Sequence, residues 1–422
     1  MGSRIAIIGT GYVGLTTGAC FAHLGHQVVC ADIDPERIAR LSKGILPIYE
    51  PGLQEMVEEQ IAAGRLRFVV GAAQAAQDCE FAYLCVQTPQ GDDGAADLTY
   101  LQAAAAEIAP VLPADSIVVN KSTVPVGSTK VVERVLGRHD VSVVSNPEFL
   151  REGSAVHDFL KPDRVVIGSD DQSAATRVAE LYDATSGHVI VTDPASAETI
   201  KYAANAFLAT KISFVNAVAA VCEAVGADVN DVVLGLGYDT RIGHEFLRPG
   251  PGWGGSCFPK DTRAMVKIAE DAGYDFNLLK GVVLVNDEQR ERMIAKVQRA
   301  VGGNLAGAVV AAWGLTFKAN TDDLRESPAI AIIGELVARG ATVKAYDPQI
   351  PKHATIAVGL DPYDVCDGAD ALVVLTEWDA FRWLDLAQVK ARLRNPSIVD
   401  TRNLLDRSAA LRLGFTYQGV GR

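Results

Sequence analysis

The chain has 422 residues, of which 49% are hydrophobic and 22% are charged, the composition of a folded protein long enough for two or three domains. Disordered, collagen-like and coiled-coil chains are excluded. The 39 Lys and Arg residues against 52 Asp and Glu residues give a net charge of -13. Because an acidic surface repels phosphate backbones, we expect no binding to nucleic acid or to an anionic membrane surface. Any anionic ligand must be held by local cationic groups.

The seven cysteines indicate a reducing compartment. They form no CxxC pair, leave one residue over in any set of disulfides and show no zinc-ligand spacing, so no metal site is predicted. The first residues run directly into an apolar strand pattern without the layout of a signal peptide. The longest stretch without Asp, Glu, Lys or Arg, 5–31, is interrupted by glycine and histidine and is not typical of a membrane span. A cytoplasmic protein without a membrane segment is expected.

Residues 1–194 follow the pattern of a doubly wound α/β domain. An apolar run at 5–8, a glycine-rich turn, a helical pattern to His23 and a second apolar run at 27–31 form a β-α-β unit. Further strand-like runs, separated by segments of helix length, lie at 68–70, 81–86, 117–120, 142–144 and 165–167. This alternation predicts a mostly parallel sheet.

The remaining chain divides into a helical segment, 195–301, and a second α/β domain, 302–422. Residues 195–225 lack glycine and proline, which predicts a long helix joining two lobes. A loop rich in glycine and proline, 235–255, is followed by helical patterns at 259–272 and over much of 281–301. Beyond them, 340–347 repeats the pattern of 25–32, and strands are expected at 308–313, 342–346, 371–375 and 398–399. The predicted fold is α/β, with two Rossmann-like domains, a long central helix and a helical middle domain.

A dinucleotide-binding fingerprint opens the chain. Gly9-Thr10-Gly11-Tyr12-Val13-Gly14 follows a predicted strand and begins a helix, and Asp32 ends the next strand. Glycines let backbone amides approach a pyrophosphate, and the acidic residue accepts the ribose hydroxyls and repels a 2′-phosphate. NAD is therefore favoured over NADP. The second α/β domain lacks the three glycines, so phosphate there would be held by Lys318 and Arg325.

Cys257 has the setting of a reactive thiol. It lies in a glycine-rich loop just before a predicted helix, next to Lys260 and Asp261. The helix dipole and the lysine favour a thiolate, and the carboxylate can orient a water or accept a proton. The other six cysteines lie mostly in apolar contexts and are expected in the core.

Several polar residues fit two interpretations. Lys201 and Asn205 share one face of the long helix among apolar neighbours, and that pattern fits a catalytic pair and a solvated face equally. Glu148 and Glu152 follow a strand end, where ligands bind in open α/β sheets, but the pattern alone favours a solvated turn. Ser122-Thr123 also follows a strand, and its hydroxyls fit an ST-turn or a helix cap as readily as ligand contacts. The basic residues of one loop region favour an anion site over a solvated surface; they are Arg241, Arg248 and Lys260.

These segments together resemble the UDP-glucose 6-dehydrogenase family of nucleotide-sugar dehydrogenases, over nearly the whole chain. The matching motifs are GTGYVG at 9–14, KSTVPVGS at 121–128, NPEFLREGSAVHDFLKPDRVVIG at 146–168, ExxKYAANAFLATKISFVNAVA from Glu198, GGSCFPKD at 254–261 and FKANTDDLRESPA at 317–329. The resemblance implies an NAD-dependent enzyme that oxidises the primary alcohol of UDP-glucose to the carboxylate of UDP-glucuronate.

The resemblance also implies roles for individual residues. Cys257 is the expected nucleophile, which forms a thiohemiacetal and then a thioester. The other expected catalytic residues are Lys201, Asn205, Asp261, Glu148 and Thr123. Expected cofactor contacts are Gly9, Gly11, Tyr12, Val13, Gly14, Asp32, Arg37, Thr88, Ser122, Thr123, Glu152, Lys260 and Arg325. Expected substrate contacts are Glu148, Phe149, Leu150, Arg151, Lys201, Asn205, Arg241, Phe246, Leu247, Arg248, Trp253, Gly254, Cys257, Phe317, Lys318 and Arg402.

In this family the middle segment implies a homodimer, with Arg241 reaching the neighbouring subunit's sugar site. One alternative stays open, because NPEFLRE is also close to the GDP-mannose dehydrogenases, which use the same mechanism. A UDP-N-acetylmannosamine dehydrogenase is disfavoured, since that branch usually has His where this chain has Ser256. A third alternative is a sensor protein that binds NAD and turns nothing over.

Overall fold

The computed structural model describes residues 2–91 and 96–422. The chain forms two compact units. The first consists of residues 1–204 and 263–272, and the second of residues 205–262 and 273–422. The boundary falls within helix α9 (Pro194–Val225). Each unit is described by itself below.

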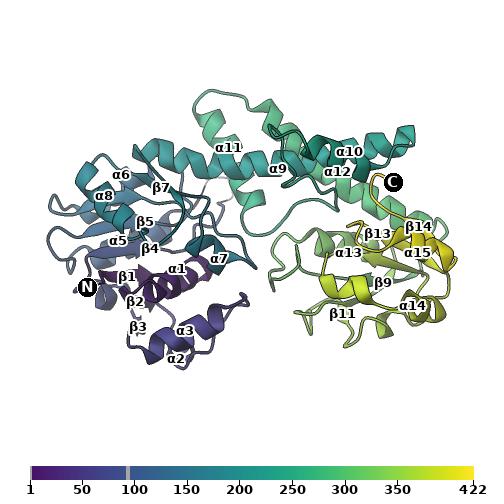
Figure 1. Ribbon diagram of the computed structural model, residues 1–422, viewed down its shortest axis with the longest axis horizontal. Helices are drawn as coiled ribbons and strands as arrows, with labels where there is room; N and C mark the ends of the chain where they lie inside the picture. Colours follow the sequence, from purple (N-terminus) through teal and green to yellow (C-terminus); the bar gives the residue numbers. More distant parts are fainter. Residues whose placement is uncertain (1, 92–95) are drawn as a thin grey trace. The chain divides into compact units, whose positions relative to one another are not determined.

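The first unit contains an eight-stranded sheet in the order β3-β2-β1-β4-β5-β6-β7-β8 (Figure 1). The strands are β1 (Arg4–Ile8), β2 (Gln27–Asp32), β3 (Leu66–Val70), β4 (Phe81–Leu84), β5 (Ile117–Asn120), β6 (Ser142–Ser145), β7 (Arg164–Gly168) and β8 (His188–Thr192). Neighbouring strands are parallel except for β6 and β7. The predicted doubly wound, mostly parallel sheet is confirmed, and β8 is a strand that the sequence pattern did not indicate.

Helices cover both faces of this sheet, which explains why its central strands are apolar on both sides. One face packs against α1 (Tyr12–His23), α3 (Leu53–Ala62), α7 (Ala155–Leu160) and α8 (Gln172–Glu180), around the buried ring of Phe21. The other packs against α4 (Ala72–Ala76), α5 (Thr99–Ile108) and α6 (Ser128–Leu136). Helix α2 (Pro35–Leu41) follows β2 and is capped by Asp34. In open α/β sheets of this kind, ligands bind at the loops that follow the carboxyl ends of the strands.

The second unit contains a six-stranded, fully parallel sheet in the order β11-β10-β9-β12-β13-β14. Its strands are β9 (Val309–Trp313), β10 (Thr342–Tyr346), β11 (Ala357–Val358), β12 (Ala371–Val374), β13 (Ser397–Asp400) and β14 (Thr416–Gln418). One face packs against the later part of α9, α10 (Val229–Gly237), α12 (Asn277–Ala300) and α13 (Pro328–Ala338). Short helices cover the other face: η1 (Asp364–Cys366), η2 (Asp379–Trp383), α14 (Leu386–Arg392) and α15 (Arg407–Arg412). The predicted second Rossmann-like domain is confirmed.

Helix α9 has 32 residues and agrees with the predicted long helix. Within residues 2–91 and 96–422 it is the one helix long and apolar enough to cross a membrane by length and composition, a test that long core helices of folded domains also pass. Two details differ from the sequence pattern. Helix α10, whose first turn is capped by Asp228, ends at Gly237 and so extends into the loop predicted at 235–255. Helix α11 (Phe258–Asp271) begins one residue before the expected Pro259.

Candidate active site

The glycine loop after β1 has the shape of a pyrophosphate cradle. A Cβ on Gly9 would lie 2.6 Å from the carbonyl oxygen of Cys85, and one on Gly14 would lie 1.9 Å from the carbonyl oxygen of Gly9. Both positions therefore exclude a side chain. Gly11, by contrast, faces open space, and no side chain caps the helix that begins after it. The free amides at the start of α1 fit an anion such as a pyrophosphate.

Asp32 is held as an anion beside this loop. Its Oδ2 atom accepts hydrogen bonds from the Thr10 amide at 3.0 Å and from the Thr10 hydroxyl at 2.6 Å. Burial acts to raise the pKa of Asp32, but the bonds from Thr10 and the charge of Arg37 outweigh it and leave the pKa below its usual value. A carboxylate at this strand end suits the ribose of NAD and disfavours a 2′-phosphate. The residues present therefore fit NAD.

Glu50 joins the cofactor loop to the loop after β6, and the sequence analysis did not find it. Its carboxylate accepts hydrogen bonds from the amides of Gly153 and Ala155, both at 2.7 Å, and from the hydroxyl of Tyr12. Glu50 is 4% exposed. The signal in the sequence is weak, because an acidic residue beside Pro51 and Gly52 is typical of a solvated turn.

Glu148 and Lys201 form a buried ion pair. The Lys201 Nζ atom donates to Glu148 Oε1 at 2.7 Å and to the Glu148 carbonyl oxygen at 2.7 Å. Burial acts to raise the pKa of Glu148, and the charge of and hydrogen bond from Lys201 outweigh it, so the pKa lies below its usual value. Of the two interpretations of Lys201, the structure excludes the solvated face, because this lysine is 3% exposed.

The residues predicted at the ends of β4 and β5 lie together. The Ser122 hydroxyl donates to the carbonyl oxygen of Val86 at 2.6 Å, and the Thr88 hydroxyl donates to the carbonyl oxygen of Thr123 at 2.8 Å. From α9, Glu198 accepts hydrogen bonds from the start of α6 and so holds the loop that follows Thr123. Packing and hydrogen bonds thus fix the backbone of this loop.

The segment after Glu148 is anchored by ionic and ring contacts. Arg151 makes a two-pronged ion pair with Asp158, with distances of 2.6 and 3.0 Å. Two cations lie near the Phe149 ring, the Arg164 guanidinium at 3.9 Å and the Lys201 ammonium at 5.4 Å from its centroid. The amide of Leu150 donates to Glu148 Oε2 at 2.7 Å. Glu152, in the same loop, is partly exposed.

In the second unit, Cys257 lies in a loop that requires glycine. A Cβ on Gly254 would lie 2.0 Å from the carbonyl oxygen of Glu326, and one on Gly255 would lie 2.8 Å from the Phe317 ring. Packing thus joins this loop to the segment 317–326. Cys257 is partly exposed, whereas the six other cysteines are buried as predicted.

Asp261 lies in the first turn of α11 and is fully buried. Its Oδ1 atom pairs with Lys260 at 2.5 Å, and its Oδ2 atom accepts from the Asn205 amide at 2.6 Å. The Lys260 ammonium is thus paired with the neighbouring carboxylate, and its expected effect on the Cys257 thiol stays a prediction.

The cationic side chains expected at the substrate are held in different ways. Arg241 pairs with Asp239, and its side chain is 86% exposed. Arg402 donates to the carbonyl oxygens of Leu375 at 2.9 Å and Phe317 at 3.0 Å. Three other cationic residues lie in the same unit: Arg248 is exposed, the Lys318 ammonium lies 5.5 Å from the centre of the Phe317 ring, and Arg325 pairs with Asp323. Of the expected apolar contacts, Leu247 and Trp253 are buried, and the Phe246 ring lies 6.2 Å from the Phe258 ring. Arg241 and Lys260 each pair with a neighbouring acid.

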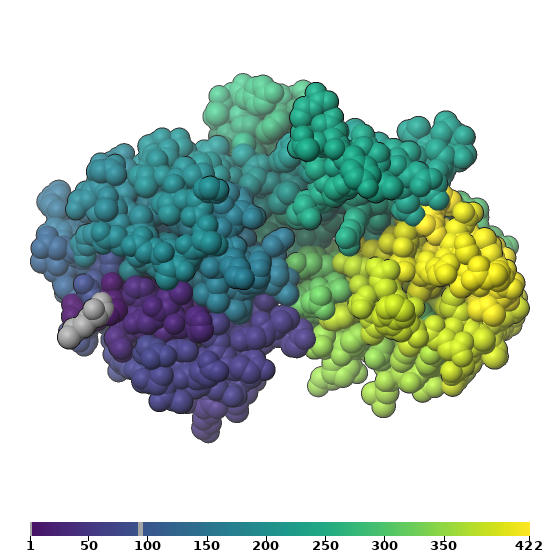
Figure 2. Space-filling view, in the orientation of Figure 1, coloured from purple at the N-terminus to yellow at the C-terminus, as the bar shows by residue number. Residues whose placement is uncertain are grey.

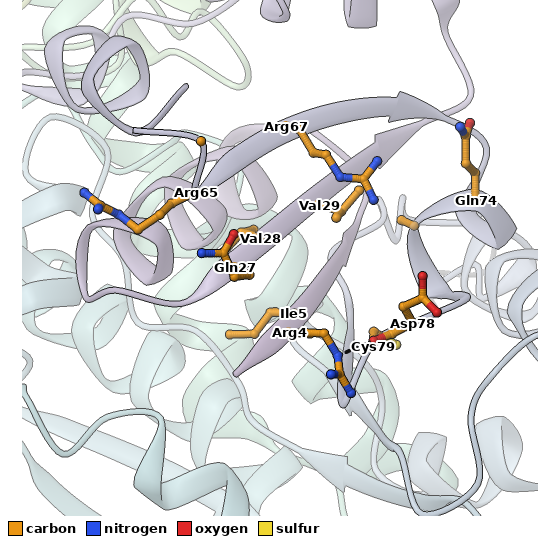
Figure 3. Close-up of a pocket in the computed structure, with 12 residues that line it drawn as sticks. Arg4, Ile5, Gln27, Val28, Val29, Arg65, Arg67, Gln74, Asp78 and Cys79 are labelled. Carbon is orange, nitrogen blue, oxygen red and sulfur yellow. Dashed lines mark hydrogen bonds between the residues drawn. The ribbon is translucent and has the colours of Figure 1, made fainter. Parts of the chain in front are cut away.

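A separate open pocket lies at the amino ends of β1, β2 and β3, away from the loops described above (Figure 3). Polar side chains around it include Arg4, Arg67 and Asp78. Arg4 donates to the Asp78 carbonyl oxygen at 2.7 Å. The pocket holds none of the predicted site residues.

Sequence comparisons agree with this geometry along the whole chain. Residues 3–186, 195–288 and 311–407 match the NAD binding domain, the central domain and the UDP binding domain of the UDP-glucose/GDP-mannose dehydrogenase family. The chain belongs to this family. A family member from Rhizobium meliloti, a UDP-glucose 6-dehydrogenase, is 47% identical, and the alignment covers 99% of each chain. The UDP-glucose 6-dehydrogenase TuaD of Bacillus subtilis is 46% identical, over 99% of this chain and 93% of its own.

A solved family structure has the same fold. A UDP-glucose dehydrogenase from the archaeon Pyrobaculum islandicum superimposes with a TM-score of 0.93 at 37% identity, covering 100% of this chain and 98% of its own. Family membership, the NAD binding domain and the fitted glycine loop make the protein an NAD-dependent oxidoreductase.

Proposed function

We propose that the protein oxidises UDP-glucose to UDP-glucuronate with two molecules of NAD, through covalent intermediates on Cys257. The single observation that carries this proposal is the partly exposed Cys257 thiol, in a loop whose glycines leave no room for side chains. The names of the relatives support UDP-glucose as the substrate.

In the proposed reaction NAD, when bound, accepts a hydride in each of two oxidations. The C6 hydroxyl first loses a proton to a base, and C6 becomes an aldehyde. The Cys257 thiolate then forms an S–C bond to that aldehyde, giving a thiohemiacetal. Its oxidation leaves a thioester, and attack by water breaks the S–C bond to release the carboxylate and the thiol. Two hydrides leave the carbon in total, so the reaction consumes two NAD and one water.

We assign roles to the polar residues from their contacts. Lys201, paired with Glu148, assists proton transfer from the C6 hydroxyl and stabilises the oxyanion of the thiohemiacetal. Glu148 and Asp261 are the carboxylates that serve water and proton movement, and Asn205 orients Asp261. Thr123 positions the water that hydrolyses the thioester. Lys201 and Asn205 lie four residues apart on the continuous helix α9, which supports their acting on one substrate.

The ligand contacts and domain roles that we propose follow from the same resemblance. Residues 1–194 hold NAD through the glycine loop, Asp32 and Arg37, with further contacts from Thr88, Ser122, Glu152, Lys260 and Arg325. Residues 302–422 hold the UDP group, with Lys318 as a cationic contact. Because all seven cysteines are free thiols, we place the protein in the reducing cytoplasm.

We also propose a homodimer built on residues 195–301. Phe207, Phe214, Val221 and Val225 are 64%, 55%, 59% and 71% exposed. Their spacing places them on one side of α9, whose residues have the teal of the middle of the colour bar in Figure 2. An apolar stripe of this length is typical of a surface covered by a partner. In the dimer, the highly exposed Arg241 would reach the neighbouring sugar site.

GDP-mannose is the second candidate substrate, because the NPEFLRE motif is shared with enzymes that oxidise it. The GGSCFPKD and FLKPDRVVIG motifs favour UDP-glucose. Initial rates on the two sugar nucleotides, at equal concentration and with excess NAD, decide between them.

The experiment that tests the proposal is the amount of NADH formed per limiting UDP-glucose, followed to completion with excess NAD. A ratio of two supports oxidation to the acid. A ratio of one means that the aldehyde is released and that the thioester route is wrong. The absence of NADH with both sugar nucleotides, together with tight NAD binding, would favour the sensor alternative.

A further inference from the structure

Lys121 is a buried lysine that the proposed reaction does not use. It follows β5 and is 5% exposed. Its Nζ atom donates to Asn146 Oδ1 at 3.0 Å and to the Tyr182 hydroxyl at 3.2 Å, and the Tyr182 hydroxyl donates to the same Asn146 oxygen at 2.7 Å. Both of these hydrogen-bond partners are neutral, so neither of them supplies a carboxylate to the Lys121 ammonium.

The Lys121 network joins two loops of the candidate site. Lys121 directly precedes Ser122 and Thr123, and Asn146 lies two residues before Glu148. Asn146 is fully buried, and two further hydrogen bonds fix it. Its side-chain amide donates to the Val166 carbonyl oxygen at 2.8 Å, and its backbone amide donates to the Asn120 carbonyl oxygen at 2.9 Å. The ammonium of Lys121 is therefore tied by one hydrogen bond to Asn146, which precedes Glu148 by two residues.

Electrostatics couple Lys121 to the Glu148–Lys201 pair. Burial lowers the pKa of Lys121 to about 8, the charge of Glu148 acts to raise it, and the charge of Lys201 acts to lower it further. The repulsion between two ammonium groups acts on both, so a charged Lys121 also makes a proton easier to remove from Lys201. Keeping a charged lysine in the interior is costly, and an apolar residue would avoid that cost.

We propose that Lys121 is a positioning residue for the Glu148–Lys201 pair, holding the segment that carries Glu148 in place and, by its positive charge, favouring release of the proton of Lys201. This inference rests on the proposed function, in which Lys201 takes part in proton transfer. It assigns no contact between Lys121 and the substrate.

The other ionisable groups around Lys121 keep one charge state between pH 6 and pH 10. Burial raises the pKa of Cys85 to about 12 and raises those of Tyr83 and Tyr182 above their usual values, so these three stay neutral. The pKa of Glu148 lies below its usual value. The small cavity beside Lys121 is also lined by Asp158, whose pKa is lowered by its partner Arg151 despite burial, and by Arg164, which stays charged. Cys257 is the same in every variant compared below, so a difference between the rate profiles of wild type and a Lys121 variant in this range reports on Lys121 and Lys201.

The test compares the pH dependence of kcat for three variants of the full-length enzyme. Lys121→Gln keeps a hydrogen-bond donor and removes the charge, whereas Lys121→Arg keeps the charge. We expect the acid side of the profile of Lys121→Gln to move to higher pH by about one unit, because the proton of Lys201 is held more tightly. Lys121→Arg keeps a positive charge throughout this range and should not move the acid side to higher pH, even if its kcat is lower. Tyr182→Phe removes one acceptor from the ammonium and should shift the midpoint in the same direction by a smaller amount.

Superimposable profiles of wild type and Lys121→Gln would overturn the electrostatic role, because a merely structural residue lowers kcat without moving the midpoint. If Lys121→Gln does not fold, an unchanged midpoint in Tyr182→Phe overturns the proposal in the same way. The wild type is assayed first with UDP-glucose and NAD. If the wild type does not form two NADH per sugar, the result counts against the proposed function. If the wild type does form two NADH per sugar and the variants keep its pH midpoint, the result counts against the role of Lys121 alone.

Discussion

The Lys201 ammonium lies 2.7 Å from Glu148 Oε1 and 2.7 Å from the carbonyl oxygen of the same residue, and both side chains are about 5% exposed or less. Lys201 therefore contacts the backbone of Glu148 as well as its carboxylate. A pair buried in this way is costly to break, because removing one member leaves an uncompensated charge in the interior.

We predict that Glu148→Gln lowers kcat by about 100-fold, because the amide still accepts from Lys201 but cannot take up a proton. The matched control is Glu133→Gln, an exposed glutamate paired with Lys130, which should leave kcat unchanged. Steady-state rates with UDP-glucose and NAD make the comparison. Because the folded-state pKa of Glu148 is lowered, its contribution to stability is present above pH 4.5 and is lost as the pH falls further. A kcat of Glu148→Gln near the wild-type value would contradict the assigned role.

Cys257→Ser should abolish formation of UDP-glucuronate, because a hydroxyl near neutral pH does not replace the thiolate as a nucleophile. The control is Cys222→Ala, which removes a buried thiol of the second unit and should keep the wild-type ratio of two NADH per sugar. Product analysis by mass spectrometry distinguishes acid from aldehyde. Acid formed by Cys257→Ser at the wild-type rate would rule out the covalent route.

Glu50→Gln should raise KM for NAD by roughly 5-fold to 10-fold, because it weakens two charge-assisted hydrogen bonds to the amides of Gly153 and Ala155. Tyr12→Phe, which removes a single hydroxyl from the same carboxylate, should have a smaller effect. NAD titrations of both variants measure the difference. Equal effects would mean that the bonds to the amides contribute nothing to cofactor binding.

Gly255→Ala should destabilise the protein by about 2 kcal/mol or more, because the added methyl meets the Phe317 ring and the backbone φ is +82°. Gly334→Ala provides the contrast. That glycine lies inside α13 with nothing within 4 Å of an added Cβ, so alanine there should stabilise by about 0.5–1 kcal/mol. Denaturant unfolding measures both. A neutral Gly255→Ala would show that this loop can shift without cost.

Lys121→Met should change how stability depends on pH. In the wild type the pKa of Lys121 is about 8 in the folded protein and 10.5 when unperturbed, so the unfolded chain binds the proton more tightly. Wild-type stability therefore rises as the pH rises from 8 to 10.5. The stability of Lys121→Met relative to wild type should be greatest below pH 8 and fall by about 3 kcal/mol across this range. Urea unfolding at several pH values gives the difference, and a difference independent of pH would contradict the lowered pKa.

Local patterns in the sequence were sufficient to predict the two Rossmann-like domains and the long helix. These patterns depend on neighbouring residues alone. They are the apolar runs such as 5–8, the glycines at the turns between elements and the absence of glycine from 195–225. Strand β8 was missed, although it reads His-Val-Ile-Val-Thr, because a single short apolar run does not distinguish a strand from a loop. Helix α10 was missed because two glycines, Gly235 and Gly237, obscured a helix that Asp228 caps.

The sequence by itself determined which residue types were available for chemistry: a glycine fingerprint ending at Asp32, a thiol at Cys257 and charged residues at strand ends. Only the tertiary structure decided how those residues are paired. It buried Lys201 against Glu148, joined Asn205 to Asp261 and placed Glu50 on the loop at 153–155. The physical reason is range: turns and caps depend on neighbours in the chain, whereas burial and ion pairing depend on residues that lie tens of positions apart and meet only when the sheets have formed.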